Sequence, residues 1–441
     1  MPNDVLERLR RANPVPGDLP APPLEPLLDR LEATPARPPT RRLAGVVGLS
    51  LAVAVVVLVA GVAFVLAGHG HRATSPDATA ATRSSSVVLR AQAPGGGAPS
   101  GQAIRQSVAI LDRRLGSISS RLRASHSGAD QITIAGVSPS ERAQVLALTV
   151  PGRLWFYDWE ANALTPNGKP VASQLQTQDR TALRISQGTS GMAPGDPGSG
   201  GLPLYQAVKL ASKQPAAPAR STLARLGPEY YLFGSPGSSA CAAAAKANGT
   251  TPIQGEHCLL SGPDTSVENL HYGLPAGVSA SESQVLTVPQ GTVVLQAANP
   301  SATDQIKPTS PDAQFYVLKD NLAILLHDIT NPRQSTDSGG SPEVEFGFTS
   351  KGQNEFSSVT KQIAHRGAEV SLGSQALDQH FAVALDNQLI TVPSIDYKVY
   401  PDGITGSGGA DITGGFTTRT ARETATLLRD GVLEVTLTPR R

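Results

Sequence analysis

One uncharged apolar stretch, from Leu43 to Ala67, constrains the chain more than any other feature. It reads LAGVVGLSLAVAVVVLVAGVAFVLA. About 20 apolar residues in a helix, each rising ~1.5 Å, cross a hydrocarbon core ~30 Å thick. The stretch therefore predicts a transmembrane helix at 43–67. A cleaved signal peptide is the alternative, but its apolar region would be only about 7–15 residues long and would lie closer to the N-terminus.

The flanking charges predict the orientation of this helix. Arg41 and Arg42 abut its start, whereas a single Arg72 follows its end. Arginine-rich flanks stay on the cytoplasmic side. We therefore expect a cytoplasmic Pro/Arg-rich tail at 1–42, a polar stalk at 68–85, and a single-pass protein of the plasma membrane whose remaining residues are extracytoplasmic.

The charge balance excludes a general affinity for nucleic acid. Lys+Arg 37 against Asp+Glu 36 gives a net charge of +1, so no large positive field attracts a polyanion. The two cysteines, Cys241 and Cys258, are expected to lie on the oxidising side of the membrane. A disulfide across so short a loop would stabilise the fold by about 3 kcal/mol. A metal site that uses His257 beside Cys258 is the alternative, but it lacks a second ligand pair.

Hydrophobic periodicity predicts an α+β fold on both sides of a long insertion. Residues 86–160 read as strand, helix, strand, helix and strand, and the first helix carries an apolar stripe at spacings of three and four. Residues 161–311 are rich in Gly, Pro, Ser and Ala, and we expect a partly disordered low-complexity insertion with only short strand-like islands, such as 292–298. Regular periodicity returns from about Gln314, with a hairpin that turns at Asp386-Asn387.

Three segments resemble one known family. They are FTSKGQNEFSSVT at 348–360, FAVALDNQLITVPSI at 381–395 and GGADITGGFTTRTARETATLLRDGVLEVTLT at 408–438. Their order resembles the large extracytoplasmic domain of SecD, the auxiliary subunit of the Sec protein translocase. The positions that carry the family motifs, which we expect to act mainly through backbone shape and core packing, are Phe348, Gly352, Phe356, Asp386, Val392, Pro393, Gly415, Phe416, Leu428 and Gly431.

The resemblance implies a base and a head. The base would be a ferredoxin-like sandwich built from 86–160 and from the last helix and strand at 417–438. The head, at 312–416, would be inserted in it and would contact polypeptide outside the membrane. In SecD the motion of the head is coupled to proton flow through further membrane helices. No counterpart of these helices occurs before Arg441, so we expect no autonomous proton-driven motor.

No motif indicates an enzyme or a cofactor. The chain contains no G-x-S-x-G, H-E-x-x-H or Walker A sequence. Gly414-Gly415 is more typical of a turn than of a phosphate loop. His327-Asp328 is expected to be an ordinary surface pair, and neither His365 nor His380 has a ligand-type partner at helical or strand spacing.

Two functions remain open from the sequence. The first is an accessory or orphan SecD-like factor in protein export, whose partners would be Sec translocase subunits and unfolded exported polypeptide. The second is an extracytoplasmic ligand-binding or sensor module that uses the same fold. Resemblance of fold does not decide between them.

The charge asymmetry around 43–67 generates a topology prediction. A reporter enzyme that is active only outside the membrane should work when fused after residue 441 and fail when fused before residue 40. Measured reporter activity in intact cells checks this, and the reverse pattern would contradict both the anchor and its orientation.

Overall fold

The computed structural model of the chain describes residues 85–93, 97–177, 179–188, 200–217, 227–251, 255–272, 274, 278, 280, 283–298, 307–371 and 377–439. The fold is mixed α+β, as the periodicity predicted. The helix expected at 43–67 and the tail at 1–42 lie outside the described residues. Within the described ranges, no helix combines the length and the apolar character needed to cross a bilayer.

The first sheet contains both ends of the described chain. Its strands are β1 (Ser85–Gln92), β2 (Arg123–His126), β3 (Gln131–Val137) and β17 (Thr436–Pro439). They pair antiparallel in the order β17-β1-β3-β2. Helix α3 (Gly101–Gly116) packs its apolar stripe on this sheet, and the short helix α4 (Arg142–Ala147) follows β3. We call this unit the base.

A separate turn precedes helix α4. Proline is typical of the first position of a helix, but Pro139 lies in this turn and the helix begins at Arg142. The Glu141 carboxylate accepts hydrogen bonds from the backbone N–H and the hydroxyl of Ser138, at 3.1 and 2.6 Å. These bonds close a separate turn before the helix begins.

A seven-stranded sheet forms the centre of the molecule. Its order is β10 (Ile324–Leu325), β4 (Leu154–Asp158), β13 (Gln379–Leu385), β14 (Gln388–Thr391), β8 (Thr292–Ala297) and β9 (Phe315–Lys319), with β15 (Ser394–Ile395) beside β13. Only β14 and β8 run parallel among these pairs. Strands from before, within and after the insertion therefore share one sheet.

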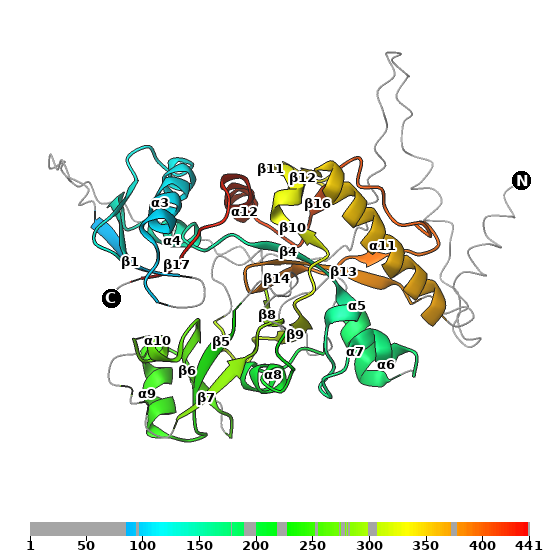
Figure 1. Ribbon diagram of the computed structural model, residues 1–441, viewed down its shortest axis with the longest axis horizontal. Helices are drawn as coiled ribbons and strands as arrows, with labels where there is room; N and C mark the ends of the chain where they lie inside the picture. The colour runs from blue at the N-terminus through cyan, green and yellow to red at the C-terminus, as the bar shows by residue number, and fades with distance from the viewer. Residues whose placement is uncertain are drawn as a thin grey trace, which may run out of the picture. The chain divides into compact units, whose positions relative to one another are not determined.

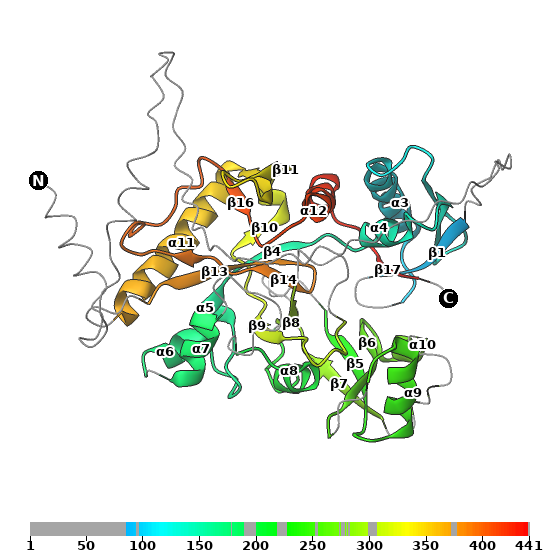
Figure 2. The ribbon, with the colours of Figure 1, turned by 180° about the vertical axis from the view of Figure 1, so that it is seen from behind.

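Both faces of this central sheet are covered. Leu154 and Phe156 point into one apolar core, and the alternate residues Trp155 and Tyr157 point into another. The first core is closed by α11 (Ser350–Val370), by α12 (Thr418–Asp430) and by a small sheet of β11 (Ile329–Thr336), β12 (Pro342–Phe348) and β16 (Ala410–Ile412). The second is closed by α5 (Trp159–Asn162), α6 (Val171–Leu175) and α7 (Arg180–Gly188). Figures 1 and 2 show α11 and α5–α7 on opposite sides of β13.

Two elements that we assigned to the base pack elsewhere. Strand β4 was expected to complete the base, but it pairs with β13 and β10 in the central sheet. Helix α12 was expected to belong to the base, yet its Ala421, Ala425 and Leu428 join the same core as Phe346. An apolar strand or helix stripe in the sequence predicts that the element is buried, but it does not predict which other element it packs against.

The insertion contains more regular structure than short strand-like islands. Besides α6 and α7, it holds α8 (Leu204–Ala211), α9 (Ser239–Asn248), α10 (Val267–Tyr272) and a three-stranded sheet in the order β6 (Cys258–Asp264), β5 (Glu229–Gly234), β7 (Ser283–Val288). Alanine-rich α9 is favoured by helix propensity, begins at the Ser238 cap and ends at Gly249 with φ 63°. A disulfide between Cys241 and Cys258 joins α9 to β6.

Gly352 allows α11 to lie against the 3₁₀ turn η1 (Leu326–Asp328). A Cβ at position 352 would lie 2.3 Å from the carbonyl oxygen of Asp328. That atom belongs to the backbone, so it cannot move aside without shifting the turn.

We therefore predict that Gly352→Ala lowers the free energy of unfolding by roughly 1–3 kcal/mol, the usual range for overpacking. Gly116→Ala is the matched control, because a Cβ there meets nothing within 4 Å at the end of α3. Chemical denaturation of both variants checks this. Equal stability of the two variants would show that the close approach is not a constraint.

Candidate functional site

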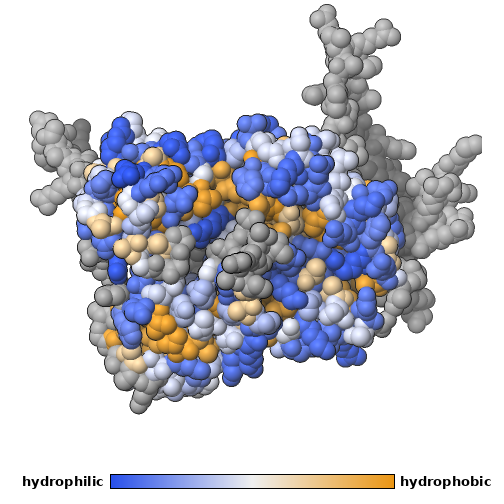
Figure 3. Space-filling model, in the orientation of Figure 1, coloured by the Kyte–Doolittle hydropathy of each residue, from blue (hydrophilic) through white to orange (hydrophobic). Residues whose placement is uncertain are grey.

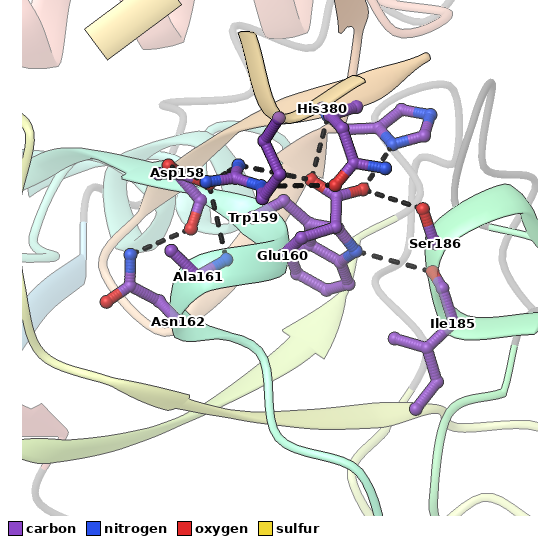
Figure 4. Close-up of polar contacts among 10 residues, drawn as sticks. Asp158, Trp159, Glu160, Ala161, Asn162, Ile185, Ser186 and His380 are labelled. Atoms are coloured by element: carbon purple, nitrogen blue, oxygen red, sulfur yellow. Dashed lines mark hydrogen bonds and ion pairs between the residues drawn. The ribbon is translucent and has the colours of Figure 1, made fainter. Parts of the chain in front are cut away.

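Glu160 lies at the centre of a buried polar network, which also contains Asp158, Arg366, His380 and Ser186 (Figure 4). The Glu160 side chain has no exposed surface. One oxygen accepts from the Ser186 hydroxyl at 2.8 Å and lies 2.6 Å from His380 Nδ1, and the other accepts from the His380 backbone N–H at 2.9 Å. Since a carboxylate can only accept, Nδ1 is assigned as the donor.

The start of α5 places these carboxylates. Strand β4 ends at Asp158, whose side chain caps α5 by accepting from the Ala161 N–H at 3.3 Å. The Asn162 side chain donates to the carbonyl of Asp158 at 2.7 Å, which tightens the same turn. Trp159 donates from Nε1 to the carbonyl of Ile185 at 3.3 Å, so the turn is also fixed to α7.

Arg366 on α11 supplies a positive charge to this network. Its guanidinium donates to both carboxylate oxygens of Asp158, a two-pronged pair that the planar fork of arginine favours. It also donates from Nε to Gln379 at 3.2 Å and lies 3.9 Å from Glu160. The network thus connects α5, α7, α11 and β13.

Burial dominates the electrostatics of the Asp158–Arg366 ion pair. Desolvation raises the pKa of the Asp158 carboxyl, although the adjacent Arg366 guanidinium acts to lower it. The ion pair therefore does not fully compensate for the removal of this carboxylate from water.

The geometry of the network favours a structural role over catalysis. In a serine–histidine–carboxylate triad the histidine accepts the proton of the serine hydroxyl. Here the Ser186 hydroxyl and the His380 ring both donate to the same Glu160 carboxylate. Both hydrogen bonds therefore end on the carboxylate instead of linking the serine to the histidine.

A second polar cluster, which we call the junction, joins the base to the central sheet. The fully buried Arg114 of α3 donates to the carbonyls of Leu148, Val150, Pro151 and Gly431 at 2.5–3.0 Å. Burial lowers its pKa to about 10, and the nearby Asp386 and Asp430 carboxylates act to raise it.

Asp386 forms the other half of the junction. It has φ 53° in the turn between β13 and β14, and its carboxylate accepts from the N–H groups of Gly152 and Arg153, both at 3.0 Å. Burial raises the pKa of the Asp386 carboxyl, while these backbone donors act to lower it. Gly152, at φ 81°, would place a Cβ 2.6 Å from the Arg114 guanidinium.

A groove of about 1180 Å³ lies beside the junction. Its apolar lining includes residues of β4, β10, β11, the end of β13, the segment before α12 and α12 itself, namely Leu154, Leu325, Ile329, Leu385, Phe416 and Leu428. Polar side chains line it as well, among them Arg153, Asp386 and Glu423. Figure 3 shows a band of hydrophobic side chains, flanked by hydrophilic ones, on the face that carries β4 and α12.

The motif residues separate into two groups. Phe348, Phe356, Phe416 and Leu428 share the first core, where the rings of Phe348 and Phe356 stack with centroids 5.0 Å apart. Gly352 lies against η1, Gly415 has φ 77° before α12, and Val392 lies in the second core.

The remaining motif positions shape the backbone. The Pro393 carbonyl accepts from the Phe381 N–H at 3.0 Å. In the junction, the Gly431 carbonyl accepts a hydrogen bond from Arg114, and the Asp386 carboxylate lies near the same guanidinium. Asp386 adds side-chain hydrogen bonds to these backbone contacts, and the role of the ten positions in backbone shape and packing stays a prediction.

Sequence reasoning missed the charged members of the buried network and Arg114 of the junction, whereas it named Asp386 as a motif residue. No ligand-type partner of His380 was expected at helical or strand spacing, and the structure brings it against Glu160, which is 220 positions away in the chain. Asp328 was expected at the surface, but its side chain is only 3% exposed and pairs with Lys351 at 2.8 Å. The available signal for Asp158 and Glu160 was the placement of two carboxylates directly after an all-apolar strand.

The metal alternative at His257 is not supported by the geometry. Cys258 is bound to Cys241, and His257 stacks on Tyr205 with ring centroids 3.9 Å apart. Among the described residues, no group of three or more His, Cys, Asp or Glu side chains is arranged to hold a metal ion.

The buried ion pair of Arg366 with Asp158 generates a stability prediction. Arg366→Met should lower the free energy of unfolding by roughly 3–5 kcal/mol, because it leaves two buried carboxylates without their cation. Lys361→Met on the same helix is the control, since its partner Asp402 is 85% exposed and the pair is 3.0 Å long. Thermal or urea unfolding measures both. A similar small loss in the two variants would contradict a role of the network in holding α11.

Comparisons with known proteins agree with the sequence motifs. Residues 302–435 match the family model described as SecDF, P1 head subdomain. The protein translocase subunit SecD of Rhodobacter capsulatus is 28% identical over 151 residues, which cover 33% of this chain and 24% of that subunit. SecD of Synechocystis sp. is 37% identical over 107 residues, which cover 24% of this chain and 20% of that subunit.

A similar solved structure is that of SecDF, described as a membrane component that enhances protein export. The match covers 81% of this chain and 98% of the SecDF chain, at 16% identity and a TM-score of 0.36. The match to the SecD subunits of Rhodobacter capsulatus and Synechocystis sp. spans about a quarter or less of the length of those subunits. The resemblance inferred from the motifs is confirmed: the chain resembles the periplasmic domain of SecD, and the family match lies in its head.

Proposed function

We propose that the chain is a SecD-like protein that takes part in protein translocation by the Sec system and contacts exported polypeptide outside the membrane. The match of 302–435 to the SecDF head carries this proposal. The relatives named as translocase subunits support it, although they are matched over only part of their length. The proposed role is that of an accessory factor, with Sec translocase subunits and unfolded polypeptide as partners.

The groove offers an extended chain two kinds of contact. Its apolar lining can bury hydrophobic side chains of an unfolded segment. Strand β10, which lines the groove through Leu325, is an end strand of the central sheet and pairs with β4 through two residues. An edge of this kind can add a strand by main-chain hydrogen bonds, which are independent of the partner's sequence.

The membrane anchor at 43–67 belongs to the same proposal. A single helix there, with 1–42 in the cytoplasm, would tether the described residues outside the plasma membrane. We further propose that the base is the ferredoxin-like unit of the SecD domain. The order β17-β1-β3-β2, with α3 between β1 and β2, supports this assignment.

Site-specific crosslinking tests the proposal. We predict that a photoreactive residue in place of Leu326 or Ile390, both in the groove lining, captures a secretory polypeptide that is arrested during export. A photoreactive residue at Val399 is the control, because that side chain is 53% exposed and lies outside the groove. Recovery of the crosslinked polypeptide from cells is the measurement.

The expected result is capture at both groove positions and little at Val399. The purified full chain should also bind a reduced, unfolded secretory protein more tightly than its native form. Equal capture at all three positions, or equal binding of the folded and unfolded forms, would contradict polypeptide engagement through the groove.

A further inference from the structure

The ionisable side chains that line the groove are mostly acidic. Five carboxyl side chains contribute to the lining, and the cationic side chains among the lining residues are Arg153 and, when protonated, His327. The carboxyls are Glu229, Asp264, Asp386, Glu423 and Glu434. A groove with low-dielectric walls and one prevailing sign of charge concentrates ligands of the opposite charge.

Several of these carboxyls are not fully compensated within the protein. Burial raises the pKa of the carboxyls of Glu229, Asp386 and Glu423. Glu423 has Arg419 as its nearest cation, with Nε 3.8 Å from a carboxylate oxygen, which is beyond hydrogen-bond distance. A cation that entered the groove would therefore stabilise the ionised form of these groups.

Hydrogen bonds hold the walls of the groove together. The Asn387 side chain donates to Glu229 at 3.2 Å, which joins the β13–β14 turn to β5. In the same turn, the Asp386 carboxylate accepts from the backbone N–H groups of Gly152 and Arg153, which precede β4. Glu229 and Asp386 therefore belong to one connected wall of the groove.

We propose that the groove prefers extended polypeptide segments that carry lysine or arginine. These side chains are positively charged and present only hydrogen-bond donors, which matches the carboxyls of the lining. Their aliphatic stems would pack on the half-buried apolar side chains of the lining, including Leu385 and Ile390. This inference rests on the proposed polypeptide engagement and adds the charge class of the segment.

Three matched peptides test the preference. Each has the same unstructured, apolar-containing sequence of about 20 residues, with four variable positions occupied by Lys, Gln or Glu. With the purified full chain at low salt, we expect the Lys peptide to bind about tenfold more tightly than the Gln peptide, and the Glu peptide most weakly. The Lys advantage should shrink as added salt screens the charges.

A variant and its control locate the effect. Glu423→Gln should reduce the ratio of Lys-peptide to Gln-peptide affinity about two- to fivefold. Glu369→Gln should leave this ratio unchanged, because Glu369 is exposed on α11 and lies outside the groove lining. Fluorescence anisotropy of labelled peptides measures both ratios.

The outcomes separate the inference from the proposed function. Equal affinity for the three peptides, or an equal effect of the two variants, would overturn the charge preference and leave polypeptide binding intact. No binding of any peptide would overturn both. Spermine that binds as tightly as the Lys peptide would show that charge alone is recognised, and it would overturn a polypeptide as the specific occupant.

Discussion

Arg366 balances carboxylates that the central sheet holds away from water. Asp158 and Glu160 are fixed at the end of β4, and the guanidinium reaches them from α11, which covers one face of the sheet. Glu160 in turn accepts from Ser186 on α7, which covers the opposite face. Because a buried carboxylate is tolerated only with partners, the positions of the two helical layers are coupled through a few charged atoms.

Arg114 plays a comparable part at the other end of β4. Its four carbonyl contacts hold the segment 148–151 and the end of α12 against α3. The Asp386 turn then docks on Gly152 and Arg153 beside it. The groove lies next to this junction, so its shape follows from how the base and the central sheet are tied together.

Local patterns in the sequence were sufficient for most elements after residue 314. The hairpin turn at Asp386-Asn387 and the last helix within 417–438 have the expected positions. The partners of β4 and α12 could not be predicted, because burial periodicity contains no information on which distant surface provides the burial. The same limit applies to Glu160 and His380, whose contact depends on the pairing of β4 with β13.

Composition was a poor guide within the insertion. The segment rich in Ala, Gly and Pro was expected to hold only short islands, but alanine favours helix when a cap is present, as at Ser238. Glycine and proline at the ends of such elements mark turns rather than an absence of structure. The acidic lining of the groove could not be inferred either, because its carboxyls come from elements that only the tertiary fold brings together.

The pairing of β4 with β13 has a consequence for the order in which the chain can become folded. Phe156 and Tyr157 leave the ribosome long before Val383 and Ala382, their partners across the sheet. Until β13 has been made, the aromatic side chains of β4 have no sheet in which to be buried, and contacts so distant in sequence form slowly. The aromatic side chains of β4 therefore stay without their sheet partners until the insertion has been made, and β8 of the insertion must pair with β14 before the centre of the molecule can close.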